Sequence, residues 1–527
     1  MDTDATVRVG AGAGLPIGDR SVDSPRSTAW YLDCLNLALL VGAVVALYGF
    51  GTHFIPTGAD PGNWLAIASE RLGRDVMAAD VTYLPLFPGL LAGLVWLWGL
   101  IAGFDIAAII TILALASAVY VCTRPLGRGY AMAAAIVVGA AGNQVEAYAC
   151  GGYPQRLATS FGLLPTFVLL RHHETRQSRY LWLSLVLLAA TVATHALIGG
   201  LLVVVLVLST AYWVYLARPD KGRLRAFVIG AFCAGVAAIV VLVASIWVPE
   251  GVVPTLNPED TPRVESLLKA VREAPIPWAI VAISAIAVLF KRIRSSAIAA
   301  TVASGMSWAL AGLAFFLVTG EPRGLMVVQV SVVVCATVTS AVALRSFGAT
   351  RHAGDKPRTT RVARHRVLLI SYVALFSALV VSGVATYASS TDWYRLVDQA
   401  ELASLDRLRA VSTSDDLVLA STGRQGMPVG WWTQGYAQRR SYSAHDPAYL
   451  AFPDERVQAE LVNDFFSGDL SDDAALSLLD DTGADFVAVD RRGQDARWLR
   501  SEFAETFTVV DDSSNIVILE APEGIAP

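Results

Sequence analysis

Gly58-Ala59-Asp60-Pro61-Gly62-Asn63-Trp64 is a short polar stretch that follows the first apolar run of membrane length. It carries one carboxylate, that of Asp60. Desolvating a carboxylate without a partner costs several kcal/mol, so an acid at the mouth of a helix bundle is more often functional than decorative. The alternative is a cap, because Asp-Pro-Gly also starts turns and helices. The choice between a catalytic base and a helix cap depends on the rest of the chain.

The composition is that of a polytopic membrane protein. Of the 527 residues, 54% are hydrophobic and only 16% are charged, which makes the lipid bilayer the main surroundings of the chain. The five cysteines show no CxxC or Cys/His spacing, so neither a zinc site nor a disulfide framework is indicated. A bound metal would have oxygen ligands, and no nucleic-acid partner is expected.

The net charge of −5 hides two unlike parts. Residues 388–527 contain 25 acidic and 11 basic side chains, a balance of −14, whereas the preceding residues carry +9. A basic membrane part joined to an acidic tail predicts two domains in different environments.

The first part of the chain predicts a tail and then a span. Residues 1–29 lack periodicity and a cleavable signal, so they are expected to be a disordered cytoplasmic tail. Tyr31–Phe50 is long enough to cross a hydrocarbon core of about 30 Å.

The run Tyr83–Phe104 decides the topology, because it is either a second span or a helix on the outer surface. As a span it puts four basic segments outside, against the positive-inside rule. Its two prolines, four glycines and two tryptophans also favour an interfacial or re-entrant helix. Residues 51–104 are therefore predicted to be an outer loop that contains a surface helix.

The resulting fold class is mainly α: a multi-pass plasma-membrane bundle of about eleven spans over residues 30–388, with a cytoplasmic N-terminus. After the first span, the others are expected at 105–123, 130–143, 157–170, 180–194, 196–216, 226–248, 277–290, 296–318, 325–344 and 367–387. The linker 345–366, with seven Lys and Arg residues, then lies inside.

Residues 389–527 alternate amphipathic helical stretches with short β-branched runs. Strands are expected at 417–419, 486–489, 506–510 and 516–519. The alternation predicts an extracytoplasmic α/β domain.

This topology puts many polar residues on the outer side, where they would meet in one cleft between the bundle and the tail domain. His195 lies at the tip of an apolar hairpin, and a hydrogen-bonded interfacial histidine is the alternative to a ligand contact. Arg323 opens a late span, where it would bind either a substrate phosphate or lipid headgroups.

The constellation resembles the GT-C superfamily of polyprenyl-linked glycosyltransferases, and four features in chain order carry the resemblance. They are the stretch 59–64 followed by Tyr-Leu-Pro-Leu-Phe-Pro-Gly at 83–89, Gly-Tyr-Pro-Gln-Arg at 152–156 near Glu146, Pro-Arg-Gly at 322–324, and Gly-Trp-Trp-Thr-Gln-Gly-Tyr at 430–436. The fourth is similar to the Trp-Trp-Asp-Tyr-Gly stretch of oligosaccharyltransferase catalytic subunits. Thr433 and Gln434 replace its Asp and Tyr, so the superfamily is inferred but not that enzyme.

The resemblance implies transfer of a sugar from a polyprenyl-phosphate donor to an envelope acceptor, which is a glycan, a lipid or a protein. Asp60 would be the catalytic base, Arg323 and Arg156 would bind the donor phosphate, and Asp60 with Glu146 would hold Mg²⁺ or Mn²⁺ where a metal is used. Substrate-binding roles fall to six further residues: Tyr83, Tyr153, His195, Trp431, Trp432 and Tyr436.

Two rival functions stay open at this point. One is a transporter or flippase of lipid-linked glycans, although no inverted repeat and no charge at mid-span depth is apparent. The other is an assembly protein that keeps the GT-C shape without its chemistry.

Overall fold

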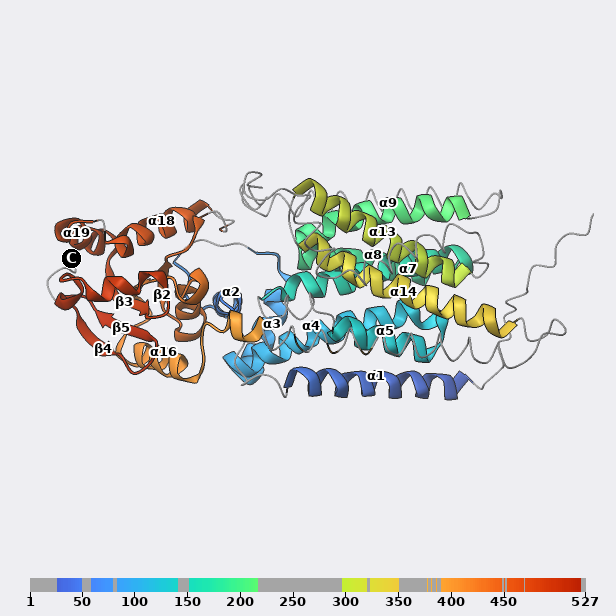
Figure 1. The fold of residues 1–527 in the computed structure, drawn as a ribbon, viewed down its shortest axis with the longest axis horizontal. Helices are drawn as coiled ribbons and strands as arrows, with labels where there is room; N and C mark the ends of the chain where they lie inside the picture. The colour runs from blue at the N-terminus through green and yellow to red at the C-terminus, as the bar shows by residue number, and fades with distance from the viewer. Residues whose placement is uncertain are drawn as a thin grey trace, which may run out of the picture.

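The computed structural model describes residues 26–49, 58–78, 83–140, 151–216, 296–319, 323–349 and 390–522, the last with gaps at 448–449, 451–452 and 469, together with residues 377, 381 and 385. The molecule is elongated, with a helical bundle at one end and an α/β domain at the other (Figure 1). Two short helices, α2 (Asp60–Arg71) and α3 (Leu86–Trp98), lie between them.

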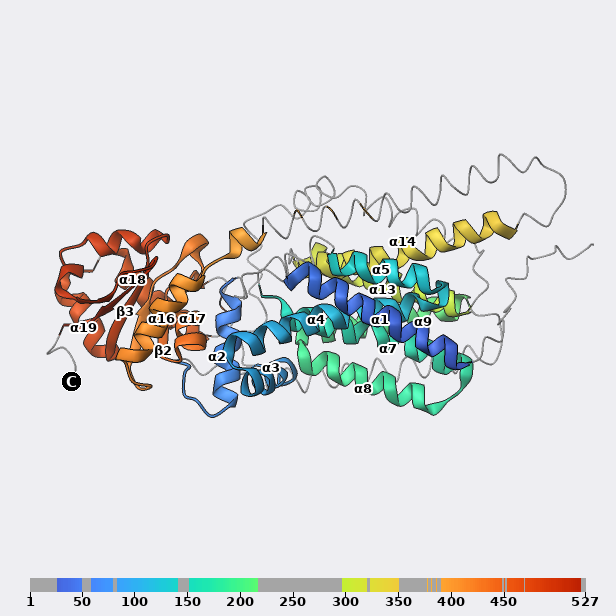
Figure 2. The same ribbon diagram turned by 90° about the horizontal axis from the view of Figure 1, so that it is seen from below.

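The bundle helices run along the long axis of the molecule (Figures 1 and 2). They are α1 (Arg26–Gly49), α4 (Leu100–Thr123), α5 (Arg128–Ala140), α7 (Tyr153–Thr175), α8 (Ser178–Thr194), α9 (Ala196–Leu216), α13 (Ser296–Thr319) and α14 (Arg323–Ala349). α1 starts inside the stretch 1–29 that was expected to be a tail.

Within the described ranges, one continuous helical stretch, Leu100–Leu126, is both long and apolar enough to cross a bilayer, and seven shorter apolar helices accompany it. The expected spans 226–248 and 277–290 lie outside the described residues, as does nearly all of 367–387. The count of eleven spans therefore stays a prediction.

Asp33 ties α1 to its neighbours at the end of the bundle remote from the α/β domain. Its carboxylate accepts from Arg124 Nε at 2.7 Å and Arg128 Nε at 2.9 Å, and from the Tyr120 hydroxyl at 2.8 Å. Two guanidinium groups and a hydroxyl thus satisfy the one carboxylate of a mostly apolar helix.

The run Tyr83–Phe104 is divided by a turn. α3 ends at Trp98, and Gly99, with φ of +83°, leads directly into α4. A Cβ on Gly103 would lie 2.7 Å from the backbone of Leu94 and Val95, so α3 is folded tightly back on α4. Trp96, Leu97 and Trp98 remain exposed at the end of α3.

The C-terminal domain is built on a five-stranded mixed sheet in the order β2-β1-β3-β5-β4. β1 pairs in parallel with β2 and β3, whereas β5 pairs antiparallel with β3 and β4. The strands are β1 (Leu417–Ala420), β2 (Arg440–Ser443), β3 (Ala484–Asp490), β4 (Thr508–Asp511) and β5 (Ile516–Glu520). The helices are α16 (Gln399–Val411), α17 (Gly430–Trp432), α18 (Pro453–Ser467) and α19 (Asp472–Thr482). The sequence predicted four of these strands and missed β2.

The two faces of the sheet belong to different cores, because successive side chains of a strand point to opposite faces. Leu417, Leu419 and Val487 pack in a cluster with residues of α18 and α19. Val418 and Ala420 join a second cluster, which also contains residues of α16, α2, α3 and α4. One apolar core therefore runs from the sheet into the bundle, and α2 lies at the junction.

Candidate active site

Asp60 is the first residue of α2, and the cap residue before it is Ala59. Pro61 follows in the first turn, where its missing N–H costs no hydrogen bond. A carboxylate in the first turn interacts favourably with the helix dipole, an effect of about 0.3–1 kcal/mol at exposed positions. Asp60 is therefore not the cap residue of α2.

The Asp60 side chain lies against the turn that precedes α7. Gly151 has φ of +102°, and a Cβ built on it would lie 2.9 Å from Asp60 Oδ2. Trp64, one helical turn after Asp60, donates its indole N–H to the Gly151 carbonyl oxygen at 3.1 Å. Only glycine fits at position 151, because this position requires both a left-handed backbone conformation and the close approach of the Asp60 carboxylate.

The same turn brings Arg156 to the site. α7 begins at Tyr153 with Pro154 in its first turn, and the Arg156 N–H donates to the Gly152 carbonyl oxygen at 3.1 Å. Arg156 is only 3% exposed. A buried guanidinium one turn into α7 and a carboxylate at its entrance form the charged part of the candidate site.

Aromatic rings support this turn from the bundle side. Trp64 packs edge-on against Tyr83 at 4.7 Å and against Phe87 at 5.6 Å between ring centroids. Tyr153, which is fully buried, stacks on Phe87 at 6.3 Å and meets Phe104 edge-on at 5.1 Å. Such pairs add about 0.5–1.5 kcal/mol each beyond the area they bury, so the predicted residues Tyr83 and Tyr153 lie in one rigid cluster.

The start of α14 lies beside the start of α7. Gln155 Nε2 is 3.6 Å from the Met326 sulfur, and Met326 is one turn after Arg323. The backbone of Arg323, the first residue of α14, is thus at the same end of the bundle as Arg156. The side chain of Arg323 is outside the described part, so its role in donor binding stays a prediction.

His195 joins α8 to α9 in an extended conformation, with φ of −159°. Its N–H donates to the Thr191 carbonyl oxygen at 3.1 Å, and its own carbonyl accepts from Gly199 N at 3.0 Å. α7 and α8 are antiparallel neighbours, so His195 is at the same end of the bundle as Tyr153, as predicted for the tip of a hairpin.

The three predicted residues of the tail domain have different surroundings. Trp431 is half-buried, edge-on to His445 at 5.4 Å between centroids. Trp432 is fully buried. The Tyr436 hydroxyl donates to the Asp406 carboxylate at 3.1 Å, and burial together with that charge raises the pKa of Tyr436 to about 12.

The predicted divalent metal stays a prediction. Among the described residues no group of three His, Cys, Asp or Glu side chains could hold a metal ion. Glu146, the second predicted ligand, lies outside those residues.

Two residues at the site were missed by the sequence reasoning: Trp64 and Gly151. Trp64 stands inside the stretch that was singled out, but nothing in the sequence pairs it with a turn 87 positions later. The Gly151-Gly152 pair before Tyr153-Pro154 was the available signal, because adjacent glycines mark a turn where backbones approach closely.

No protein-family model and no curated protein sequence matches the chain. Solved structures do. The structure of ArnT from Cupriavidus metallidurans bound to undecaprenyl phosphate matches with a TM-score of 0.54 and 15% identity, covering 95% of this chain and 99% of that one. Archaeal oligosaccharyltransferase AglB from Archaeoglobus fulgidus, in complex with an inhibitory peptide and a dolichol-phosphate, matches with a TM-score of 0.56 and 13% identity, covering 95% and 77%.

Both matches extend over the bundle and the α/β domain together. The chain therefore shares the fold of these two solved structures, and the resemblance predicted from the sequence is confirmed at the level of the fold.

Proposed function

We propose that the protein is an integral-membrane glycosyltransferase that transfers a sugar from a polyprenyl-phosphate donor to an extracytoplasmic acceptor of the cell envelope. The observation that carries the proposal is the Asp60 carboxylate held against the Gly151 turn, with buried Arg156 one turn beyond. Two solved structures with this fold, those of ArnT and AglB named above, were determined with undecaprenyl phosphate and a dolichol-phosphate.

The chemistry divides between the two charges. The Asp60 carboxylate accepts the proton of the acceptor hydroxyl, whose oxygen forms the new bond to the anomeric carbon of the sugar. The bond from that carbon to the phosphate oxygen breaks, and the polyprenyl phosphate leaves with the electron pair. Arg156 and Arg323 stabilise the negative charge that develops on the phosphate, and the N-termini of α7 and α14 add their dipoles.

The remaining predicted residues, apart from Trp432, bind the substrates in this proposal. Tyr83 and Tyr153 lie around the Gly151 turn, next to Asp60 and Arg156. His195 lies at the same end of the bundle. Trp431 and Tyr436 belong to the acceptor side, in the domain that faces away from the lipid. Mg²⁺ or Mn²⁺ would add a further positive charge beside Asp60 and Glu146.

The test uses lipid-linked sugars extracted from a strain that lacks the gene. We expect the envelope glycans of that strain to lack one sugar, and the purified wild-type protein to release polyprenyl phosphate from the extracted lipids when acceptor is present. Mass spectrometry measures both. In detergent there is no membrane to cross, so a transporter or an assembly protein would leave the lipids unchanged, and that outcome would reject the proposal.

A reporter fusion tests the proposed orientation. The basic segments and the acidic domain sort to opposite sides only with an odd number of spans and a cytoplasmic N-terminus. Alkaline phosphatase fused after Pro527 should therefore be active in cells, whereas a fluorescent protein that folds only in the cytoplasm should be dark there. The reverse pattern would put the acidic domain and the candidate site inside the cell.

A further inference from the structure

The C-terminal domain holds the turn before α2 through the backbone N–H and the backbone carbonyl of one residue, Gly58. Gly58, buried and with φ of +95°, donates its N–H to the Tyr394 carbonyl oxygen at 2.6 Å. Its own carbonyl oxygen accepts the indole N–H of Trp432 at 2.8 Å. Gly58 is two residues before Asp60, so these bonds fix the point from which the catalytic residue is presented.

A second contact, from backbone to backbone, holds α2 at Gly62. A Cβ on Gly62 would lie 2.6 Å from both the Trp431 carbonyl carbon and the Trp432 nitrogen. From the other side, a Cβ on Gly435 would lie 2.8 Å from Leu65 Cβ. Because neither position has room for a side chain, α2 and the segment 430–435 are in direct backbone contact.

The segment is shaped for this contact. Thr433–Ala437 forms one turn of π-helix directly after α17, and such turns are frequent at functional positions. Thr433 is fully buried and its hydroxyl donates to the Val429 carbonyl oxygen, while Gln434 Nε2 donates to the Ser441 carbonyl oxygen at 2.8 Å. The two residues that depart from the oligosaccharyltransferase pattern therefore bond inside their own domain.

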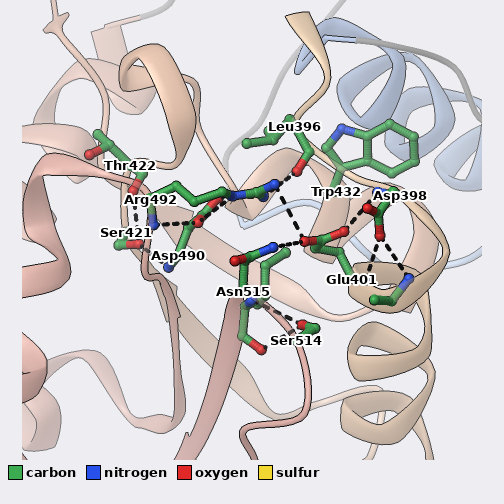
Figure 3. Close-up of polar contacts among 12 residues, drawn as sticks. Leu396, Asp398, Glu401, Ser421, Thr422, Trp432, Asp490, Arg492, Ser514 and Asn515 are labelled. Carbon is green, nitrogen blue, oxygen red and sulfur yellow. Dashed lines mark hydrogen bonds and ion pairs between the residues drawn. The ribbon is translucent and has the colours of Figure 1, made fainter. Parts of the chain in front are cut away.

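An ionic cluster fixes the Tyr394 side of the attachment (Figure 3). Arg492 donates to the Leu396 carbonyl oxygen at 2.6 Å, two residues after Tyr394. The same guanidinium pairs with Asp490 at 2.8 Å and Glu401 at 3.4 Å, and both of those carboxylates are fully buried. The segment 394–396 is thus bound to β3 and α16, and Trp432 lies beside it in the same view.

We propose that Trp432 is a positioning residue: its indole N–H and the Gly62–Gly435 contact hold the turn 58–60 so that the Asp60 carboxylate stays against Gly151. The inference rests on the proposed function in that Asp60 is its catalytic carboxylate. Trp432 then acts through α2 and not by touching the acceptor.

The test is Trp432→Phe in the full-length protein, with Trp498→Phe as the matched control. Phenylalanine keeps an aromatic ring in the pocket but removes the donor to Gly58. Trp498 is also buried, in the aromatic cluster of the opposite sheet face. Hydrogen exchange of peptides covering 58–67 and steady-state kinetics are measured for both variants.

We expect exchange at 58–67 to rise about fivefold in Trp432→Phe, the effect of losing one net hydrogen bond, and to stay unchanged in the control. The turnover number should fall while the KM values for donor and acceptor stay within about twofold, since misplacing a catalytic group affects the transition state more than binding. Gly435→Ala should produce the same changes in exchange and turnover, because the added methyl group displaces α2. If this variant does not fold, the Trp432→Phe result alone tests the proposal.

Unchanged exchange at 58–67 in Trp432→Phe would overturn the positioning role. So would a raised acceptor KM at normal turnover, which would assign Trp432 to acceptor binding. The exchange result does not depend on catalysis, so a wild-type protein without transferase activity would reject the proposed function and leave the structural link measurable.

Discussion

Asp60→Asn should abolish nearly all sugar transfer, lowering the turnover number by roughly 10²- to 10⁴-fold, the range typical of general acid–base groups. The substitution keeps the size of the side chain, so the close contact with Gly151 is preserved. α2 should form as before, because its cap residue is Ala59 and asparagine is tolerated well at helix starts. The protein should accumulate normally in the membrane while its glycan product disappears.

Asp75→Asn is the matched control. Asp75 is an exposed acid of the same segment between α1 and α3, beyond the end of α2, and its replacement should leave turnover unchanged. Transfer is measured on the extracted lipids, with membrane accumulation quantified in parallel. Normal product from Asp60→Asn would remove Asp60 from the active site and, with it, the main residue-level reason for regarding the protein as an enzyme.

Arg156→Lys should lower turnover on the order of 10²-fold, the effect of losing one preorganised contact to a developing oxyanion. Lysine keeps the positive charge but offers no planar fork for bidentate contact with a phosphate. Because Arg156 is 3% exposed, no free lipid headgroup reaches it without entering the site. Arg323→Lys should show a loss of the same kind, since the start of α14 adjoins that of α7.

Arg179→Lys serves as the control for both arginines. Arg179 is exposed near the start of α8, where it stacks over Tyr180 at 5.0 Å, at the opposite end of the bundle from the candidate site. Release of polyprenyl phosphate is followed in single-turnover experiments. A fully active Arg156→Lys would leave this arginine a structural role only, and a fully active Arg323→Lys would return Arg323 to lipid-headgroup anchoring.

The sequence singled out the local parts of the candidate site, whose roles stay predictions. Asp60 and Arg156 stand out because charge is rare near apolar runs, and the alternation of helices and strands after residue 389 predicted the α/β domain. The strand β2 was missed because Arg440-Ser441-Tyr442-Ser443 lacks apolar alternation. It is held in place by backbone pairing with β1 and by the Ser441 hydroxyl, which donates to the Val418 carbonyl oxygen at 3.0 Å.

The contacts between residues far apart in the chain could not be predicted from sequence patterns. Trp432 and Gly58 are separated by 374 positions, and neither residue type indicates a partner. At Gly62, Gly151 and Gly435 a side chain would clash with a neighbouring segment. The clash can be recognised only in the folded structure, where that segment lies close. Tyr436 was predicted as a substrate residue from its motif, yet the hydroxyl bond to Asp406 appears only in the folded domain.

The attachment of Gly58 also sets an order for biosynthesis. A ribosome makes the turn before α2 early, but the two groups that satisfy its buried amide and carbonyl belong to Tyr394 and Trp432. Buried backbone groups need such partners, so the turn before α2 stays incompletely folded until the last quarter of the chain has been synthesised. Truncated chains without that quarter would thus lack both partners of Gly58, and the turn that presents Asp60 would stay unfinished.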